Sequence, residues 1–266
     1  MILEALTWRP QDVGKGFRVW SLRKLSDFVV EAGIVKEMSH STLGRILQEH
    51  GASFQRTKTW KESTDPEFVS KKKRIDHLKK HPPTNGRVIS FDEYGPVEVR
   101  PRGGQSWCQT GHPARVRATY RRFHGVRHYL SAYDLQDDRL LMHGYRRKRW
   151  QEILPFLRYL RRRYPADERL YIILDNWSPH KKSEVVRWAR VHNISLVYSP
   201  SNASWLNPIE SIFSGIQRFV FSNSDFADHQ EIALAIHKYN RWRNSHPSDA
   251  TLKKIEKHKP SFVTRH

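Results

Sequence analysis

Alternating apolar and polar positions divide the second half of the chain into strands and helices. Period-two or continuous apolar runs predict strands at RVISFDE (87–93), one or two around Arg115–Tyr120, 126–135, 138–145, LYIIL (170–174) and ISLVYS (194–199). Apolar residues at helical spacing predict helices at about 150–163, 181–192, from Pro208 onward, and 229–244. Several antiparallel strands followed by alternating helices and strands predict an α/β fold, a mixed sheet flanked by helices.

The first 62 residues follow helical spacing instead. Ser21 can cap a helix that Gly33 closes, and a second helix begins near Ser41 and ends at Gly51. Two short helices joined by a turn predict a small helix-turn-helix domain, winged-helix-like if SFQRTKTW (53–60) forms a strand or wing. A plain helical subdomain is the alternative.

A charged connector separates these two regions. Asp65-Pro66-Glu67 predicts a helix start, and the helix ends before HPPTNG (81–86). Pro82, Pro83 and Gly86 in this segment predict a domain boundary. We therefore expect four parts: a helix-turn-helix region (1–62), a helical connector and linker (63–86), a catalytic domain (87–225) and a helical tail (226–266).

Charge narrows the class of partner. Lys and Arg number 47 against 27 Asp and Glu, a formal net charge of +20. Such an excess favours a polyanion, with nucleic acid ahead of an anionic membrane surface. No apolar run approaches the ~18 residues of a membrane-spanning helix. The single cysteine, Cys108, and the lack of a signal-peptide pattern predict a cytoplasmic protein.

Three acids follow the predicted strands at places where α/β proteins gather ligands. Asp92 lies near the end of the first strand, Asp175 directly follows LYIIL, and Glu210 begins the helix after ISLVYS. Alternation places Asp92 and Glu93 on opposite faces of their strand, so a regular strand does not direct both into one site.

Each acid also has an ordinary structural interpretation. Asp92 can be a strand-end charge, Asp175 can cap the following turn, and Glu210 can complete a capping box with Asn207 as the cap. A buried acid at a strand end needs a partner, however, and clustered carboxylates repel one another. A divalent cation with oxygen ligands, Mg²⁺ or Mn²⁺, relieves that repulsion.

Three segments make the chain resemble the DDE transposases of the mariner superfamily, in its bacterial insertion-sequence branch. They are ISFDEYG (89–95), LDNWSPHK (174–181) and SPSNASWLNPIESIFSGIQR (199–218), and the 34 residues between Asp175 and Glu210 match the family's spacing. The resemblance covers about residues 20–250. The family usually carries two helix-turn-helix units, whereas this chain has room for one.

The resemblance implies an RNase H-like fold and a catalytic, metal-binding triad of Asp92, Asp175 and Glu210. Two divalent metal ions, Mg²⁺ or Mn²⁺, would cleave DNA strands at element ends and transfer them into target DNA. Asn176 and His180 would support the site, although packing or capping is an equal alternative for His180. The implied partners are double-stranded DNA, as terminal inverted repeats and target, and a second copy in a homodimer on DNA, with no membrane. A bacterial cytoplasm with nucleoid association is the implied location.

Basic and polar residues are the candidates for DNA contact. They are His40, Thr42, Arg45, Gln48, Arg146, Arg147, Lys148 and Arg149. The run RRRY (161–164) is a further basic cluster, although charge runs are usually solvated surface. Two other functions stay open: a related RNase H-like nuclease or integrase, and a DNA-binding repressor with an inactive catalytic domain.

Overall fold

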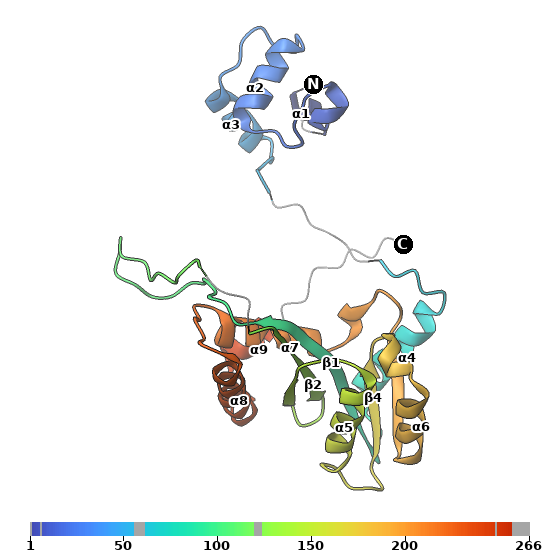
Figure 1. Cartoon of the computed structure of the whole chain (residues 1–266). Helices are drawn as coiled ribbons and strands as arrows, with labels where there is room; N and C mark the ends of the chain where they lie inside the picture. The colour runs from blue at the N-terminus through green and yellow to red at the C-terminus, as the bar shows by residue number, and fades with distance from the viewer. Residues whose placement is uncertain (1, 6, 56–61, 120–123, 248, 257–266) are drawn as a thin grey trace. The chain divides into compact units, whose positions relative to one another are not determined.

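A computed structural model of the chain describes residues 2–5, 7–55, 62–119, 124–247 and 249–256 (Figure 1). The chain forms two compact units, residues 1–59 and 60–266. Each unit has its own buried apolar cluster, so each is described separately.

The first unit is helical. It contains α1 (Ile2–Ala5), the 3₁₀ turn η1 (Pro10–Val13), α2 (Leu22–Glu31) and α3 (His40–Glu49). Ser21 caps α2 as predicted, with its side chain accepting from Lys24 N at 3.2 Å. The cap of α3 is Ser39, two residues before the predicted start, because its hydroxyl accepts from Thr42 N at 3.0 Å. Leu25, Val29 and Leu43 close the core between α2 and α3.

No wing is present in the part of this unit that the structure describes. Residues 52–55 form no strand, and the rest of the predicted wing lies outside the described residues. Phe54 is almost fully exposed, so it finds no sheet to pack against.

The second unit contains a five-stranded mixed sheet in the order β3-β2-β1-β4-β5. Its strands are β1 (Gly86–Glu98), β2 (Val126–Asp134), β3 (Arg139–Tyr145), β4 (Arg169–Leu174) and β5 (Ile194–Tyr198). The first three strands form an antiparallel meander, and β4 and β5 run parallel to β1. The predicted mixed sheet is therefore confirmed.

Helices cover both faces of this sheet. They are α4 (Phe68–Lys80), α5 (Trp150–Arg161), α6 (Ser183–Val191), α7 (Ile209–Ile216), α8 (His229–Ser245) and α9 (Ala250–Glu256). Short turns η2 (Ser178–Lys181) and η3 (Ser204–Leu206) and a π-helical turn, η4 (Gln217–Phe221), complete the unit. In Figure 1, α5 and α6 lie to one side of the sheet and α7, α8 and α9 to the other.

The alternation predicted for β1 places its side chains in two different cores. Ile89 and Phe91 join the cluster under α5 and α6, whereas Val88 joins Ile75 and Ile173 beneath α4. The middle of β1 therefore presents Asp92 and Glu93 to opposite faces of the sheet, as expected from period-two geometry, and the strand continues past the predicted end at residue 93 to Glu98.

Two predictions about this unit are wrong. Residues 115–119 form no strand; the segment between β1 and β2 extends away from the sheet, with Trp107 fully exposed (Figure 1). The helix α4 begins at Phe68 rather than at Pro66, because the side chain of Asp65 accepts from Glu67 N at 2.8 Å and holds residues 65–67 in a turn.

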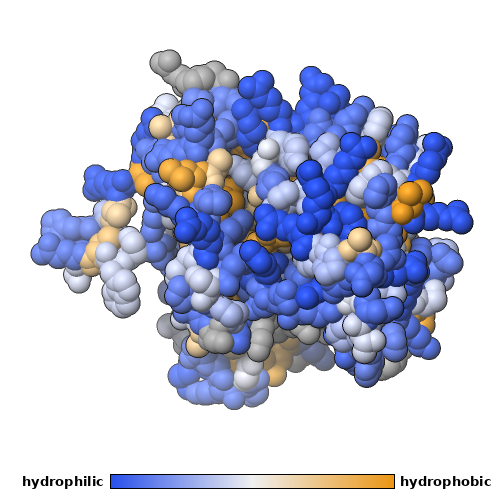
Figure 2. Space-filling model, turned by 90° about the horizontal axis from the view of Figure 1, so that it is seen from below, coloured by the Kyte–Doolittle hydropathy of each residue, from blue (hydrophilic) through white to orange (hydrophobic). Residues whose placement is uncertain are grey.

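The face of the molecule drawn in Figure 2 is mostly hydrophilic, and its apolar residues are visible in separate patches. None of the helices in the described ranges is long and apolar enough to cross a membrane.

Candidate active site

Asp92 and Asp175 stand at the same level on neighbouring parallel strands. The register of β1 against β4 pairs Val88 with Tyr171 and Ser90 with Ile173. This pairing ends at Ser90 and Ile173; continued two residues further, the same register would set Asp92 opposite Asp175, which directly follows β4. Alternate residues of a strand share a face, so Asp92 lies on the face of Val88 and Ser90, and Asp175 continues the face of Tyr171 and Ile173. The structure thus brings together two acids that are 83 positions apart in the sequence.

Asn207 attaches the start of α7, which carries Glu210, to β1 beside Asp92. The hydroxyl of Ser90 donates to Asn207 Oδ1, and Asn207 Nδ2 donates to the carbonyl of Phe91 at 2.8 Å. The backbone N–H of Ile209 donates to Ser90 Oγ at 2.9 Å. The start of α7 is therefore fixed to β1, one residue before Glu210.

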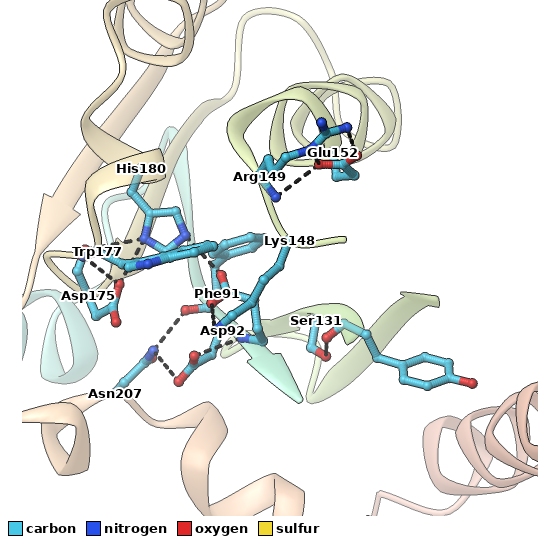
Figure 3. Close-up of polar contacts among 12 residues, drawn as sticks. Phe91, Asp92, Ser131, Lys148, Arg149, Glu152, Asp175, Trp177, His180 and Asn207 are labelled. Atoms are coloured by element: carbon cyan, nitrogen blue, oxygen red, sulfur yellow. Dashed lines mark hydrogen bonds and ion pairs between the residues drawn. The ribbon is translucent and has the colours of Figure 1, made fainter. Parts of the chain in front are cut away.

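These contacts overturn the capping-box interpretation of Glu210. The helix α7 starts at Ile209 with Pro208 as its cap residue and without a side-chain cap. Asn207 does not cap the helix because its amide is used on β1, beside Asp92, whose Oδ2 lies 3.5 Å from Asn207 Nδ2 (Figure 3).

The pKa of Asp92 is raised to about 7. Burial is the largest cause, and the negative charges of Glu93, Glu210 and Asp175 add to it. Glu210 and Asp175 therefore both lie within electrostatic reach of Asp92. Such crowding of carboxylates disfavours their ionised forms, and a cation between them would reverse the effect.

A buried histidine joins Asp175 to a fourth acid. His180 Nδ1 lies 2.9 Å from Asp175 Oδ1, and His180 Nε2 lies 2.9 Å from Glu93 Oε1. The histidine side chain is 1% exposed and that of Glu93 is 6% exposed. Burial acts to lower the pKa of His180, but its two carboxylate partners raise it to about 9. The imidazole is therefore charged at neutral pH.

The contact with His180 lowers the pKa of Asp175, whereas it raises the pKa of the histidine. Burial opposes ionisation of Asp175, but hydrogen bonds from His180 and from the Trp177 N–H, at 3.0 Å, lower the pKa of its carboxyl. Both bonds end on Oδ1. Asp175 Oδ2 accepts no hydrogen bond from any residue that the structure describes, so this oxygen is available to a ligand (Figure 3).

Asn176 and Lys148 lie around this arrangement. Asn176 Nδ2 donates to the carbonyl of Ser199, which fixes the turn after β4 to the end of β5. Lys148 Nζ lies 3.9 Å from Glu93 Oε2 and 4.5 Å from the centre of the Trp177 ring. Asn176 is therefore a positioning residue, and Lys148 places a cation beside the acids.

Glu93 is the residue that sequence reasoning missed. Alternation correctly placed it on the face opposite to Asp92, but it reaches the site through His180. One signal was present in the sequence: Glu93 continues the buried apolar face of Ile89 and Phe91, where an acid requires a partner.

The acids do not form a finished metal centre. In the described ranges, no three His, Cys, Asp or Glu side chains are grouped so that they could hold a metal ion as they stand. The oxygen-only donor set fits a hard divalent cation in kind, and the free Asp175 Oδ2 and the raised pKa of Asp92 fit it electrostatically.

The candidate DNA-contacting residues differ in their exposure and in whether their side chains already have partners. His40, Thr42, Arg45 and Gln48 are exposed along α3, where Arg45 pairs with Glu49 at 3.0 Å. Arg146 and Arg147 are exposed before α5. Arg149 is bound to Glu152 at the start of α5, with Nη2 donating to Oε1 at 2.8 Å, so its guanidinium is already occupied.

Comparison with known proteins places this site in a family. The model of the family described as "DDE superfamily endonuclease" matches residues 87–233, more than half of the chain. This span runs from β1 into α8 and includes Asp92, Asp175 and Glu210. No curated protein matches the sequence.

Solved structures resemble the whole chain in fold. The crystal structure of the Mos1 strand transfer complex matches with a TM-score of 0.63 and 15% identity, over 99% of this chain and 79% of that chain. The Mos1 mariner paired end complex with Mn matches with a TM-score of 0.59 and 16% identity, over 94% and 82%. The corresponding complex with Mg gives 0.61 and 15%, over 99% and 80%. At this identity the likeness establishes the shared RNase H-like fold.

Proposed function

The chain belongs to the DDE superfamily of endonucleases, and from this membership we propose that it is a DNA transposase of the mariner group. It cleaves DNA strands at the ends of its element and joins them to target DNA. The observation that carries the proposal is the approach of three acids: Asp92 on β1 and Asp175 just after the parallel strand β4, with Glu210 held near Asp92 through Asn207. The Mos1 structures of the same fold are titled as complexes with transposon ends or with Mn or Mg, which supports DNA and divalent metals as partners here.

Asp92, Asp175 and Glu210 are the residues that would hold two divalent ions, Mg²⁺ or Mn²⁺. Such a pair supplies an activated nucleophile and stabilises the leaving oxygen in phosphodiester cleavage. The protein's own contribution is to keep Asp175 ionised and oriented through His180, and to keep Asp92 in an acidic pocket that gains from a cation.

The basic residues before α5 and the exposed residues of α3 position the DNA. Lys148, with Arg146 and Arg147 nearby, places positive charge beside the acids, where the phosphate to be cut must lie. The exposed face of α3 is the proposed reader of the terminal repeat. A homodimer on two element ends and a location on the bacterial nucleoid complete the proposal.

The test is a strand transfer reaction. A DNA fragment bounded by the inverted repeats that flank the coding region is incubated with the protein, Mg²⁺ and a target plasmid. The proposal predicts joined products with wild type and none with Asp92→Asn. Cleavage without joining would favour the related nuclease, and DNA binding without cleavage would favour the repressor.

A further inference from the structure

A basic groove lies between α5 and α6, apart from the acids. It has a volume of about 560 Å³ and is lined by Pro155, Arg158, Arg161, Arg162, Trp188 and His192. No acidic side chain lines it. Both helices begin at the end of the sheet that carries the acids and run away from it, and α5 spans about 18 Å at 1.5 Å per residue. The groove is therefore at the far end of the domain from Asp175.

Arg161 is a buried cation that forms no direct ion pair within the described residues, although the charges of Glu168 and Asp167 act on it from a distance. Its residue is 8% exposed, Nη1 donates to the Glu168 carbonyl at 2.8 Å, and Nη2 donates to the Pro165 carbonyl. Its Nε is buried without a hydrogen-bond partner, and no carboxylate of the described residues forms an ion pair with it. A buried charge whose hydrogen bonds all go to neutral carbonyl groups is costly, so this position favours an incoming anion.

Arg158 and Arg162 add two free guanidinium groups. They lie one helical turn apart and are both exposed, and neither side chain forms a hydrogen bond or ion pair with a residue of the described ranges. Like charges at this spacing repel each other. By contrast, Arg163 on the next position donates to the Tyr159 hydroxyl. The groove thus keeps its arginines unpaired while neighbouring arginines find partners.

An aromatic wall completes the groove. The rings of Trp188 and His192 stack at 4.1 Å with an angle of 19°, and the Arg158 guanidinium carbon lies 5.9 Å from the Trp188 ring. His192 Nδ1 lies 2.8 Å from the Trp188 carbonyl, which fixes the histidine ring. The stacked rings thus form one side of the groove, with Arg158 over the tryptophan ring.

The C-terminal ends of α5 and α6 reduce the positive electrostatic potential of the groove but do not cancel it. Both α5 and α6 end at the groove, and each C-terminus carries about half a negative charge. This partial negative charge attracts the arginine side chains and offsets part of their positive charge. Three guanidinium charges exceed it, so the groove remains positive.

We propose that this groove binds the phosphodiester backbone of DNA as a second contact, remote from the acids. Guanidinium groups bind phosphate oxygens in pairs, and a phosphate would supply the direct ion-pair partner that Arg161 does not find among the described residues. The inference takes DNA as the partner from the proposed function and adds where a further stretch of it lies. Duplex and single-stranded DNA offer the same chemistry.

The test is DNA binding by the full chain carrying Asp175→Asn, so that cleavage does not enter the measurement. Arg158→Ala with Arg162→Ala is compared with a matched pair, Lys238→Ala with Arg241→Ala, which removes the same charge from the exposed face of α8. Dissociation constants for a duplex and a single strand of arbitrary sequence are measured over a series of salt concentrations. Arg161 is left intact because its backbone contacts support folding.

The groove pair should raise Kd about tenfold and lower the slope of log Kd against log salt by about 2, one unit for each lost phosphate contact. The α8 pair should change the slope by much less. A loss of affinity for the duplex alone or for the single strand alone identifies the form of DNA that the groove binds. An unchanged slope on both, or an equal loss with the α8 pair, would overturn the inference. A chain that binds through the groove and never cleaves would refute only the proposed function.

Discussion

His180 Nε2 lies 2.9 Å from Glu93 Oε1, and this contact connects the buried face of β1 to the end of β4. Through its other nitrogen the same ring holds Asp175. A side chain that is not itself one of the three predicted acids therefore fixes the orientation of one of them. Ligand carboxylates in metal sites are commonly oriented by such outer hydrogen bonds.

Replacing Glu93 should weaken metal binding without removing any proposed ligand. Glu93→Gln leaves His180 with a neutral partner, which loosens its hold on Asp175, and an affinity loss of about 10–100-fold is expected for such outer partners. Isothermal titration with Mn²⁺ measures it. Glu184→Gln, an exposed acid at the start of α6, is the matched control and should bind as wild type does. Equal affinity for Glu93→Gln would refute the positioning role.

The stability of the second unit should fall in alkaline solution because of His180. Its folded-state pKa of about 9 exceeds the ordinary value of 6.5, so its stabilising effect is complete below about pH 6.5 and is lost as pH rises through about 9. At about 1.4 kcal/mol per pKa unit the loss is about 3 kcal/mol. Urea unfolding across this range should show the loss in wild type and a much smaller one in His180→Gln. Parallel curves for the two proteins would contradict the charged state of His180.

Asn207 should matter for stability as well as for catalysis. Asn207→Ala leaves the Phe91 carbonyl and the Ser90 hydroxyl without their buried partner, at a cost of about 1–3 kcal/mol for each unsatisfied group. It also frees the start of α7 that carries Glu210. Thermal unfolding should show a clear drop in Tm, whereas Asn85→Ala, an exposed position, should not. A stable Asn207→Ala protein with full activity would show that this link is dispensable.

The exposed face of α3 should contribute to sequence-specific binding. Arg45→Ala with Gln48→Ala removes two side chains that point to solvent from α3 and leaves the buried Leu43 and Leu47 intact. Affinity for the DNA that flanks the coding region should fall about tenfold or more, at about 1–3 kcal/mol for each lost base contact. Lys36→Ala, outside the helix, is the control. Unchanged discrimination between flanking and arbitrary DNA would exclude α3 as the reader.

Sequence periodicity was sufficient for the sheet and for two of its site residues. The alternation in RVISFDE and the apolar run LYIIL predict two strands that the structure confirms, and Asp175 directly follows the second as expected. The first strand is longer than predicted: β1 continues to Glu98, so Asp92 lies in its middle, just beyond the part that pairs with β4. Local rules failed where long-range contacts decide the outcome. Asn207 looks like a helix cap in the sequence, but its amide is drawn to β1, 116 residues away from Phe91. Glu93 looked peripheral because no local pattern reveals its pairing with His180.

Loop conformation was the other limit. The segment around Arg115 has alternating residues that favour a strand, but the described part finds no neighbouring strand and extends from the sheet. A strand exists only when a partner supplies its hydrogen bonds, which a single sequence does not specify.

The central claim is that Asp92, Asp175 and Glu210 act together on DNA through divalent cations. Nicking of supercoiled plasmid in Mn²⁺, with wild type and Asp175→Asn compared, tests it most directly. The account predicts nicks with wild type only, abolished by a chelator, and a loss of at least about 100-fold in the variant. Equal nicking by both proteins, or nicking that persists without metal, would contradict it.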